Sequence, residues 1–288
     1  MKKIFIVELL LIAISVIVGY IIFFAKEVDD VAENGPIQSE IVSVINTVPL
    51  FEGVLAAGIS WDYEQDRFFI STDMPHSLFT KNIASFYVVN AALNQIEYKK
   101  ELKVDGDLEG IAYIGNAEVA IISELGTIYY LKEHEGEWHE THNVSLFGGD
   151  GRHKLGSLAY DAGNKLLYSA EKEGEKIIYQ ISRSGELLQR FAFDAGTVKA
   201  NREFDIDTAY TISGMAYNNQ NQHLYLFSEA YSTIFKYKPE TKQLSAVYGV
   251  NNIHESSGIT LKRGEAYLVG DFESYLPPPS IYRVSLPD

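Results

Sequence analysis

The sequence predicts an all-β fold: a five-bladed β-propeller, with six blades as the alternative, closed by an N-terminal strand and preceded by one transmembrane helix. One short motif, a small residue followed by apolar and aromatic residues, recurs at intervals of roughly 44–57 residues, the period of four-stranded propeller blades. Each copy leads into a second apolar run that ends on a carboxylate. Helical periodicity is nearly absent after the N-terminal apolar segment. The five copies begin at Gly58, Gly110, Ser157, Gly214 and Gly258.

Each of the first four repeats contains β-prone runs separated by turn residues, as expected of a four-stranded blade. The motif forms the inner strand, and the outer strands follow it along the chain. A polar insertion at 195–210 is expected to form a loop between the third and fourth repeats. The expected strands are 58–62, 67–72, 84–90 and 95–103 in the first repeat, and the expected outer strands of the next three are 127–132 and 137–146, 176–182 and 186–193, and 233–238 and 243–248.

The fifth repeat lacks one strand. Its strands are expected at 258–261, 266–270 and 280–285, whereas a β-prone run at 41–48 has no partner near it in the sequence. We therefore expect the N-terminal run to complete the C-terminal blade, because closing the ring removes an exposed sheet edge. A degenerate sixth blade within 26–56 or 195–211 remains the alternative.

The N-terminal segment predicts the location of the protein. Two lysines precede residues 4–24, which are apolar with three interruptions. At about 1.5 Å per residue, a helix of this length spans roughly 30 Å, the hydrocarbon thickness of a bilayer. The lysines before it and the mostly acidic residues after it predict an N-terminus in the cytoplasm. A cleaved signal peptide is the rival interpretation, but residues 23–25 lack the usual small-residue cleavage pattern.

These features predict an uncleaved anchor at 1–25, an acidic stalk at 26–40 and a propeller domain at 41–288. The predicted location is the inner membrane of the cell, crossed once, with the C-terminal domain in the periplasm. The formal net charge of −15 argues against binding to nucleic acid or anionic lipid, since both need a basic surface. The sequence has no cysteine, which excludes disulfides and thiolate metal ligands.

A carboxylate follows the second strand of every repeat. In a ring, equivalent positions form a circle about the axis, so these acids are expected near one mouth of a central channel. Two interpretations remain open. Each acid accepts hydrogen bonds within its own turn, or the circle binds a cation, for which carboxylate oxygens are ligands suited to calcium. The acids are Asp73, Glu124, Glu171, Glu229 and Asp271.

Glu109 is the best single candidate for a metal ligand. It directly precedes the motif glycine of the second repeat, in a loop rich in acids, and it shares that repeat with Glu124. Trp61 and Tyr63 are interpreted as packing residues. The sequence contains no G-x-S-x-G nucleophile elbow, no H-E-x-x-H and no phosphate-binding glycine loop. Whether the protein is an enzyme is therefore left open.

The segment DLEGIAYIG at 107–115 and the strand endings I-S-E, S-A-E and S-E together resemble the SdiA-regulated family, which is distantly similar to NHL-repeat propellers. The resemblance covers 41–288 and implies a five-bladed propeller with a calcium site, facing the periplasm. It implies no known activity. Members of the family tend to carry glutamate before the motif glycine of several repeats. Glu109 keeps this pattern, whereas Gly156 and Ser257 stand where glutamate is expected.

Two functions from different classes are consistent with these features. The first is a binding or scaffolding module, anchored in the membrane by its N-terminal helix, that presents a channel mouth to a small ligand or an envelope protein, with calcium as a candidate cofactor. The alternative is a calcium-dependent hydrolase or lactonase of the propeller type, in which the ion polarises a substrate oxygen. The sequence places no evident catalytic base beside the acids, which favours the first.

Overall fold

A computed structural model describes residues 37–51, 54–73, 83–148, 152–172, 176–193, 198–199, 211–230, 232–251, 253, 256–270 and 280–287. The chain divides into two units, Met1–Ile37 and Gln38–Asp288, and the strands belong to the second unit apart from the first residue of β1. Every regular element in the described ranges is a strand. No helix in these ranges is long and apolar enough to cross a bilayer, and the expected anchor lies outside them.

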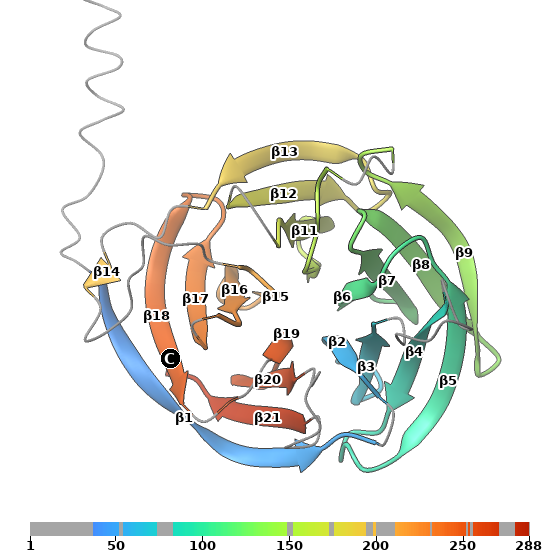
Figure 1. The fold of residues 1–288 in the computed structure, drawn as a ribbon, viewed down its shortest axis with the longest axis horizontal. Coiled ribbons are helices and arrows are strands. Elements are labelled where there is room, and N and C mark those ends of the chain that lie inside the picture. The colour runs from blue at the N-terminus through green and yellow to red at the C-terminus, as the bar shows by residue number, and fades with distance from the viewer. Residues whose placement is uncertain are drawn as a thin grey trace, which may run out of the picture. The chain divides into compact units, whose positions relative to one another are not determined.

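Three sheets of four strands each follow one another along the chain and are arranged around a common centre (Figure 1). Within each sheet, consecutive strands pair antiparallel from an inner strand to an outer one. The strands are β2 (Ala56–Asp62), β3 (Arg67–Thr72), β4 (Ile83–Val89) and β5 (Ile96–Lys103); β6 (Leu108–Tyr113), β7 (Glu118–Ser123), β8 (Thr127–His134) and β9 (Glu137–Ser145); and β10 (Ala159–Asp161), β11 (Leu166–Ala170), β12 (Ile177–Ser182) and β13 (Leu187–Ala192).

The remaining strands form one larger sheet with the order β15-β16-β17-β18-β1-β21-β20-β19. Each half of this sheet runs from an inner strand to an outer one, and β1 joins the halves at the periphery (Figure 1). A two-residue strand, β14 (Val198–Lys199), also pairs with β1, within the insertion that was expected to be a loop. The other strands are β15 (Gly214–Asn218), β16 (His223–Ser228), β17 (Thr233–Lys238), β18 (Gln243–Asn251), β19 (Ser256–Lys262), β20 (Glu265–Gly270) and β21 (Ser280–Ser285).

The strand β1 (Ile37–Pro49) provides the expected N-terminal closure and extends it. Residues 44–49 pair antiparallel with β21, as the fourth strand of that half. Residues 39–43 pair parallel with β18 of the other half, which the sequence pattern did not predict. The register shifts between Val44 and Asn46. Because an irregularity of this kind bends a strand, one continuous strand serves both halves.

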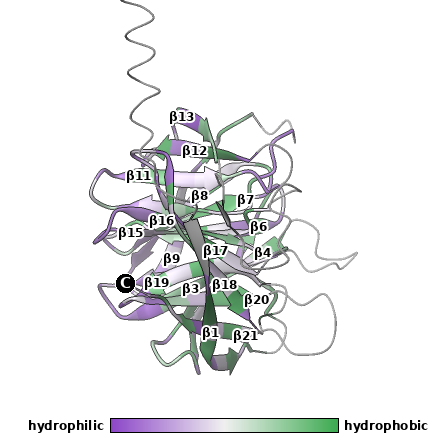
Figure 2. Ribbon diagram, turned by 90° about the vertical axis from the view of Figure 1, so that its left-hand side faces the viewer, coloured by the Kyte–Doolittle hydropathy of each residue, from purple (hydrophilic) through white to green (hydrophobic). Residues whose placement is uncertain are grey.

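Burial decreases from the inner strands to the outer ones. All residues of β3 and β6 are buried, whereas β5, β9 and β13 alternate or are mostly exposed. Strands buried on both faces consist of continuous apolar runs, which explains why the motif and the run after it are the most hydrophobic parts of each repeat. In Figure 2, hydrophobic residues are concentrated in the strands and hydrophilic residues in the connecting turns.

Hydrophobic clusters fill the spaces between neighbouring sheets. Between the first two sheets, Trp138 packs against Phe69 and Phe86, with ring centroids 5.2 and 5.1 Å away. The side chain of Arg67 in the first sheet forms an ion pair with Glu133 in the second. Aromatic packing and ion pairing therefore hold the first sheet against the second, since a single sheet could not bury both of its faces.

Glycines let the inner strands approach one another closely. A Cβ atom on Gly110 would lie 2.1 Å from the backbone nitrogen of Leu158, and one on Gly58 would lie 2.4 Å from the carbonyl oxygen of Glu109. A Cβ on Gly258 would lie 2.8 Å from the Cα of Gly58, so the last inner strand touches the first. The recurring glycine of the motif is therefore a packing requirement at the centre of the ring.

We expect Gly110→Ala to lower the free energy of unfolding by about 3 kcal/mol or more, because the added methyl group meets backbone that cannot move without shifting a strand. Urea denaturation followed by circular dichroism measures this change. Gly163→Ala is the control, since its Cβ would meet only Asp161 Oδ1, at 3.3 Å, and should change stability by less than about 0.5 kcal/mol. Equal losses in the two variants would contradict the packing requirement.

Adjacent residues of β1 provide a test of the closure. Val42 is 5% exposed and belongs to the buried cluster with Tyr248 and Val284, whereas Ile41 is 65% exposed. We expect Val42→Ala to lower the free energy of unfolding by about 1–2 kcal/mol through lost burial and an added cavity. Ile41→Ala should cost less than about 0.5 kcal/mol. If thermal and urea unfolding show the larger loss for Ile41→Ala, β1 does not pack as described.

Candidate functional site

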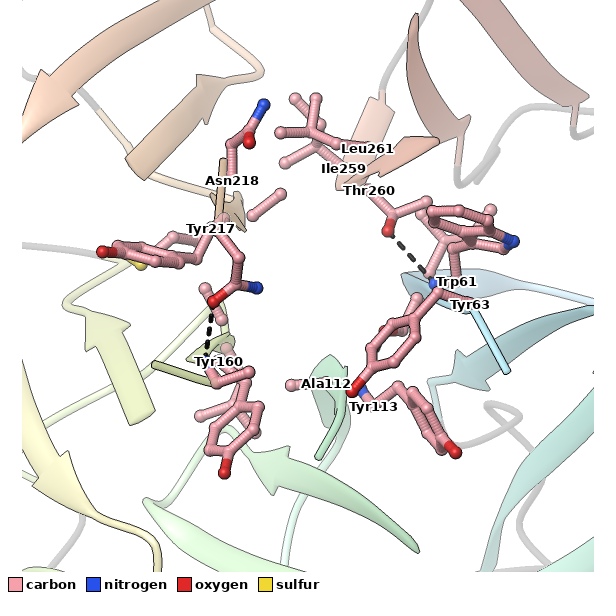
Figure 3. Close-up of a pocket in the computed structure, with 18 of the residues that line it drawn as sticks. Trp61, Tyr63, Ala112, Tyr113, Tyr160, Tyr217, Asn218, Ile259, Thr260 and Leu261 are labelled. Atoms are coloured by element: carbon pink, nitrogen blue, oxygen red, sulfur yellow. Dashed lines mark hydrogen bonds between the residues drawn. The ribbon is translucent and has the colours of Figure 1, made fainter. Parts of the chain in front are cut away.

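A cavity of about 520 Å³ lies at the centre of the ring, where the inner strands β2, β6, β10, β15 and β19 end (Figure 3). This volume falls within the range of small-molecule sites, about 300–1,000 Å³. Each motif contributes its second, third and fourth residues, which are respectively aliphatic, small and, in four of the five copies, aromatic. These residues are Ile59, Ser60 and Trp61; Ile111, Ala112 and Tyr113; Leu158, Ala159 and Tyr160; Met215, Ala216 and Tyr217; and Ile259, Thr260 and Leu261.

Polar side chains fix the turns that follow three of the inner strands. Asp62, Asp161 and Asn218 each accept a hydrogen bond from a backbone N–H two or three residues further on, at 2.9–3.0 Å. Such side-chain-to-backbone bonds stabilise tight turns. They hold the turn residues Tyr63 and Asn219 where both line the cavity.

Hydroxyl and amide side chains in the cavity join neighbouring inner strands. Ser60 Oγ accepts a hydrogen bond from the backbone nitrogen of Tyr113 at 2.8 Å. Thr260 Oγ1 accepts one from the backbone nitrogen of Trp61 at 3.1 Å (Figure 3). Asn219 similarly accepts the backbone N–H of Ala162, at 2.8 Å. Each hydroxyl is held in place as an acceptor and keeps its own proton as a donor.

Five aromatic side chains line the cavity: Trp61, Tyr63, Tyr113, Tyr160 and Tyr217 (Figure 3). Tyr63 is 49% exposed and makes edge-on contacts with Trp61 and Tyr113, with ring centroids 6.4 and 5.2 Å away. Burial is the largest factor that raises the pKa of Tyr63, Tyr113, Tyr160 and Tyr217 above the usual value of 10.0. These phenols therefore stay neutral at physiological pH and offer apolar ring faces and O–H groups.

The acids predicted from the sequence lie away from this cavity. Glu109 is the second residue of the inner strand β6. Glu124 follows β7, and its backbone nitrogen donates a hydrogen bond to the carbonyl oxygen of Asp107 at 2.8 Å. The backbone nitrogen of Asp73 likewise donates to Leu55, at 3.2 Å, and Glu171 forms an isolated β-bridge with Leu155, just before the third inner strand. None of these residues lines the cavity, and neither does Glu229. Asp271 lies outside the described residues.

Three of these acids are paired with basic groups supplied by the third repeat. Glu109 Oε1 lies 2.7 Å from Lys172 Nζ. The other pairs are Glu124 with Lys154, at 3.0 Å, and Glu171 with His153, at 2.8 Å. The Tyr179 hydroxyl also donates to Glu171. We call this set of residues at the starts of the inner strands the acidic end.

The buried environment of Glu109 alters the ionisation of its carboxyl group. Its side chain is 3% exposed. Burial raises the pKa of Glu109 to about 7, Lys172 opposes this by stabilising the carboxylate, and the charges of Glu124 and Asp107 add to the rise. The Ser71 hydroxyl donates to the Glu109 carbonyl oxygen at 2.6 Å and fixes its backbone. This carboxyl group can therefore change charge near neutral pH.

The sequence pattern does not identify the cavity. Trp61 and Tyr63, which the sequence predicts as packing residues, contact each other, and both also line the cavity. The signal was the aromatic residue at the fourth place of the motif, which recurs with the same period as the carboxylates. Recurrence alone could not tell which of the two circles surrounds a hollow.

A ring of small antiparallel sheets with a cavity where the inner strands end defines a β-propeller. The model of the SdiA-regulated family matches residues 51–272, which is most of the chain. The protein therefore belongs to the SdiA-regulated family, as the segment at 107–115 indicates.

A solved structure of another protein agrees with the fold. Glutaminyl cyclase from Myxococcus xanthus is similar over 87% of this chain and 97% of that chain, with a TM-score of 0.63 and 13% identity. The β-propeller domain of Cps50 (Swd1) from Myceliophteria thermophila matches with a TM-score of 0.48 and 8% identity, over 85% of this chain and 100% of that one. A chain of a nidogen/laminin complex matches with a TM-score of 0.49 and 13% identity, over 75% of this chain and 72% of that one. No curated protein sequence matches this chain.

The raised pKa of Glu109 predicts a pH dependence of stability. Because the protonated form is favoured in the folded state, Glu109 stabilises the fold below its ordinary pKa of 4.5, and this contribution is lost as the pH rises through about 7. We expect the free energy of unfolding, measured in urea, to fall between about pH 5 and pH 8. Glu109→Gln should remove the part of this decrease that comes from ionisation of Glu109. Glu97→Gln, on the exposed face of β5, is the control and should keep it. An unchanged profile in Glu109→Gln would show that another group titrates.

Proposed function

We propose that the protein is a binding module that holds a small neutral ligand in its central cavity. The supporting observation is the chemistry of the lining. Among the described residues that line the cavity, Arg263 carries a permanent charge, and there is no carboxylate, lysine or histidine. The cavity therefore offers apolar surface, aromatic faces and hydrogen-bonding groups, but no ordinary general base. This combination favours binding over catalysis.

A neutral sugar is the ligand class that matches this lining. The C–H face of a pyranose ring stacks on aromatic side chains such as Trp61 and Tyr160, and its hydroxyl groups can bond to fixed amides and hydroxyls. Asn218, Gln220 and Thr260 supply such groups from two neighbouring inner strands and the turns after them. An acetamido sugar would also match the amide side chains.

We also propose that the domain binds its ligand in the periplasm. The apolar segment within residues 1–25 supports an anchor in the inner membrane, and the acidic stretch after it supports a domain in the periplasm. The proposed domain has five blades. This count is supported by the strand order, if β15–β18 form one blade and β19–β21 with the second part of β1 form the next.

One observation favours the alternative, a calcium-dependent hydrolase or lactonase. Glu109 is buried, and its pKa of about 7 suits a general base near neutral pH. The likeness to glutaminyl cyclase is consistent with an enzyme on this fold, although propellers host many functions. In this alternative the reaction takes place at the acidic end, so the two proposals use opposite ends of the inner strands.

Calorimetric titration of the full-length protein with N,N′-diacetylchitobiose and with cellobiose tests the proposal. We expect saturable binding of at least one of these sugars. Tyr63→Ala should weaken it about tenfold, because an exposed stacking face is lost. Tyr98→Ala is the matched control. Tyr98 lies on the outer strand β5, where it bonds to Glu137, so binding should be unchanged.

The alternative gives a different pattern in the same titration. Binding that is lost in Glu109→Gln but kept in Tyr63→Ala would place the ligand at the acidic end and contradict the cavity as the site. Absence of binding for both sugars would reject neutral sugars as the ligand class.

A further inference from the structure

Lys172 brings a positive charge to the acidic end. Its Nζ lies 2.7 Å from Glu109 Oε1, and its side chain is 32% exposed. The charges of Glu109, Asp73 and Glu124 raise the pKa of Lys172 above its usual value despite its burial. These three acids belong to the first and second sheets, whereas Lys172 follows β11 in the third. One ammonium group therefore interacts with acids from two other sheets.

The backbone and a glycine hold Lys172 in this position. Its backbone nitrogen donates to the carbonyl oxygen of Lys154 at 2.7 Å. A Cβ atom on Gly156 would lie 3.2 Å from both Cβ and Cγ of Lys172. The stem of Lys172 therefore packs against Gly156, and a side chain at position 156 would push the stem by a few tenths of an ångström.

The arrangement of donors at the acidic end does not fit calcium. Calcium takes six to eight oxygen ligands at about 2.3–2.6 Å. Here the carboxylates of Glu109, Glu124 and Glu171 are paired with side chains of the third repeat. Within the described ranges, no group of three or more His, Asp or Glu side chains is placed to hold a metal ion. An ion beside Glu109 would also meet the Lys172 ammonium and be repelled.

We propose that Lys172 supplies the cation of the acidic end in place of a divalent metal ion, and that this lysine decides which ions the acidic end accepts. The inference does not depend on a ligand in the central cavity. A covalently attached ammonium acts at a high effective concentration and needs no free ion in solution. Without it, the buried Glu109 carboxyl group would lose the charge that stabilises its ionised form, and either a proton or a free cation would have to neutralise it.

Calcium titration of the full-length protein, by calorimetry and by melting temperature, tests this inference. We expect no saturable binding by the wild type up to about 10⁻³ M, the weak end of protein calcium sites. Lys172→Met should have a lower melting temperature than the wild type. It should bind calcium saturably, and its melting temperature should rise with the logarithm of the calcium concentration. Adding Glu109→Gln to Lys172→Met should abolish the binding.

Two further variants act as controls. Lys154→Met removes the same charge from the pair with Glu124, where the lysine is 40% exposed, and should not create a calcium site. Lys172→Arg keeps the positive charge and should not bind calcium. If Lys172→Met does not fold without calcium, Lys172→Gln replaces it, because the amide can still donate to Glu109. Saturable binding by the wild type that is lost in Glu109→Gln would overturn the inference. Absence of calcium binding in every Lys172 variant would overturn it as well.

Discussion

The close approach of the inner strands at the centre of the ring is the constraint on which the rest of the structure depends. Gly110 lies against Leu158, Gly214 against Ser257, and Gly258 against Gly58, at distances that leave no space for a Cβ atom. The last of these contacts brings the first repeat against the fifth and closes the ring. Each glycine stands at or near the start of its inner strand. The strands therefore meet most tightly near their starts and leave a hollow near their ends, where the motif residues are larger.

This geometry gives the two ends of the inner strands different chemistry. The starts carry Glu109 and lie beside the carboxylates that follow the second strands, and there the acids meet lysine and histidine side chains. The ends carry aliphatic, small and aromatic residues around a cavity of about 520 Å³. Charged side chains are therefore concentrated at the crowded starts of the inner strands, and neutral side chains surround the cavity at their ends. A buried charge needs a partner within contact distance, and the crowded end provides it.

Much of the fold could be predicted from the sequence, because the repeat imposes the same strand pattern on every segment. The expected strand at 67–72 matches β3, and the strand at 41–48 lies within β1, whose residues 44–49 pair with β21. The parallel pairing of β1 with β18 and the short strand β14 were not predictable, since both depend on contacts between distant segments. For the site, periodicity identified two circles of equivalent residues. It could not show the lysine counter-ions, because Lys172 and Lys154 do not recur at the equivalent places of the other repeats.

Departures from the repeat therefore carry information that the repeat itself cannot. The third repeat replaces the motif glycine with Ser157 and the expected glutamate with Gly156, and it supplies the basic partners of Glu109, Glu124 and Glu171. Here the stem of Lys172 packs against Gly156. The carboxylates of a symmetric circle would repel one another, and either a free cation or a cationic side chain of the protein can relieve that repulsion. A cationic side chain that occurs in one repeat makes the ring asymmetric, and in this chain Lys172 of the third repeat is such a side chain.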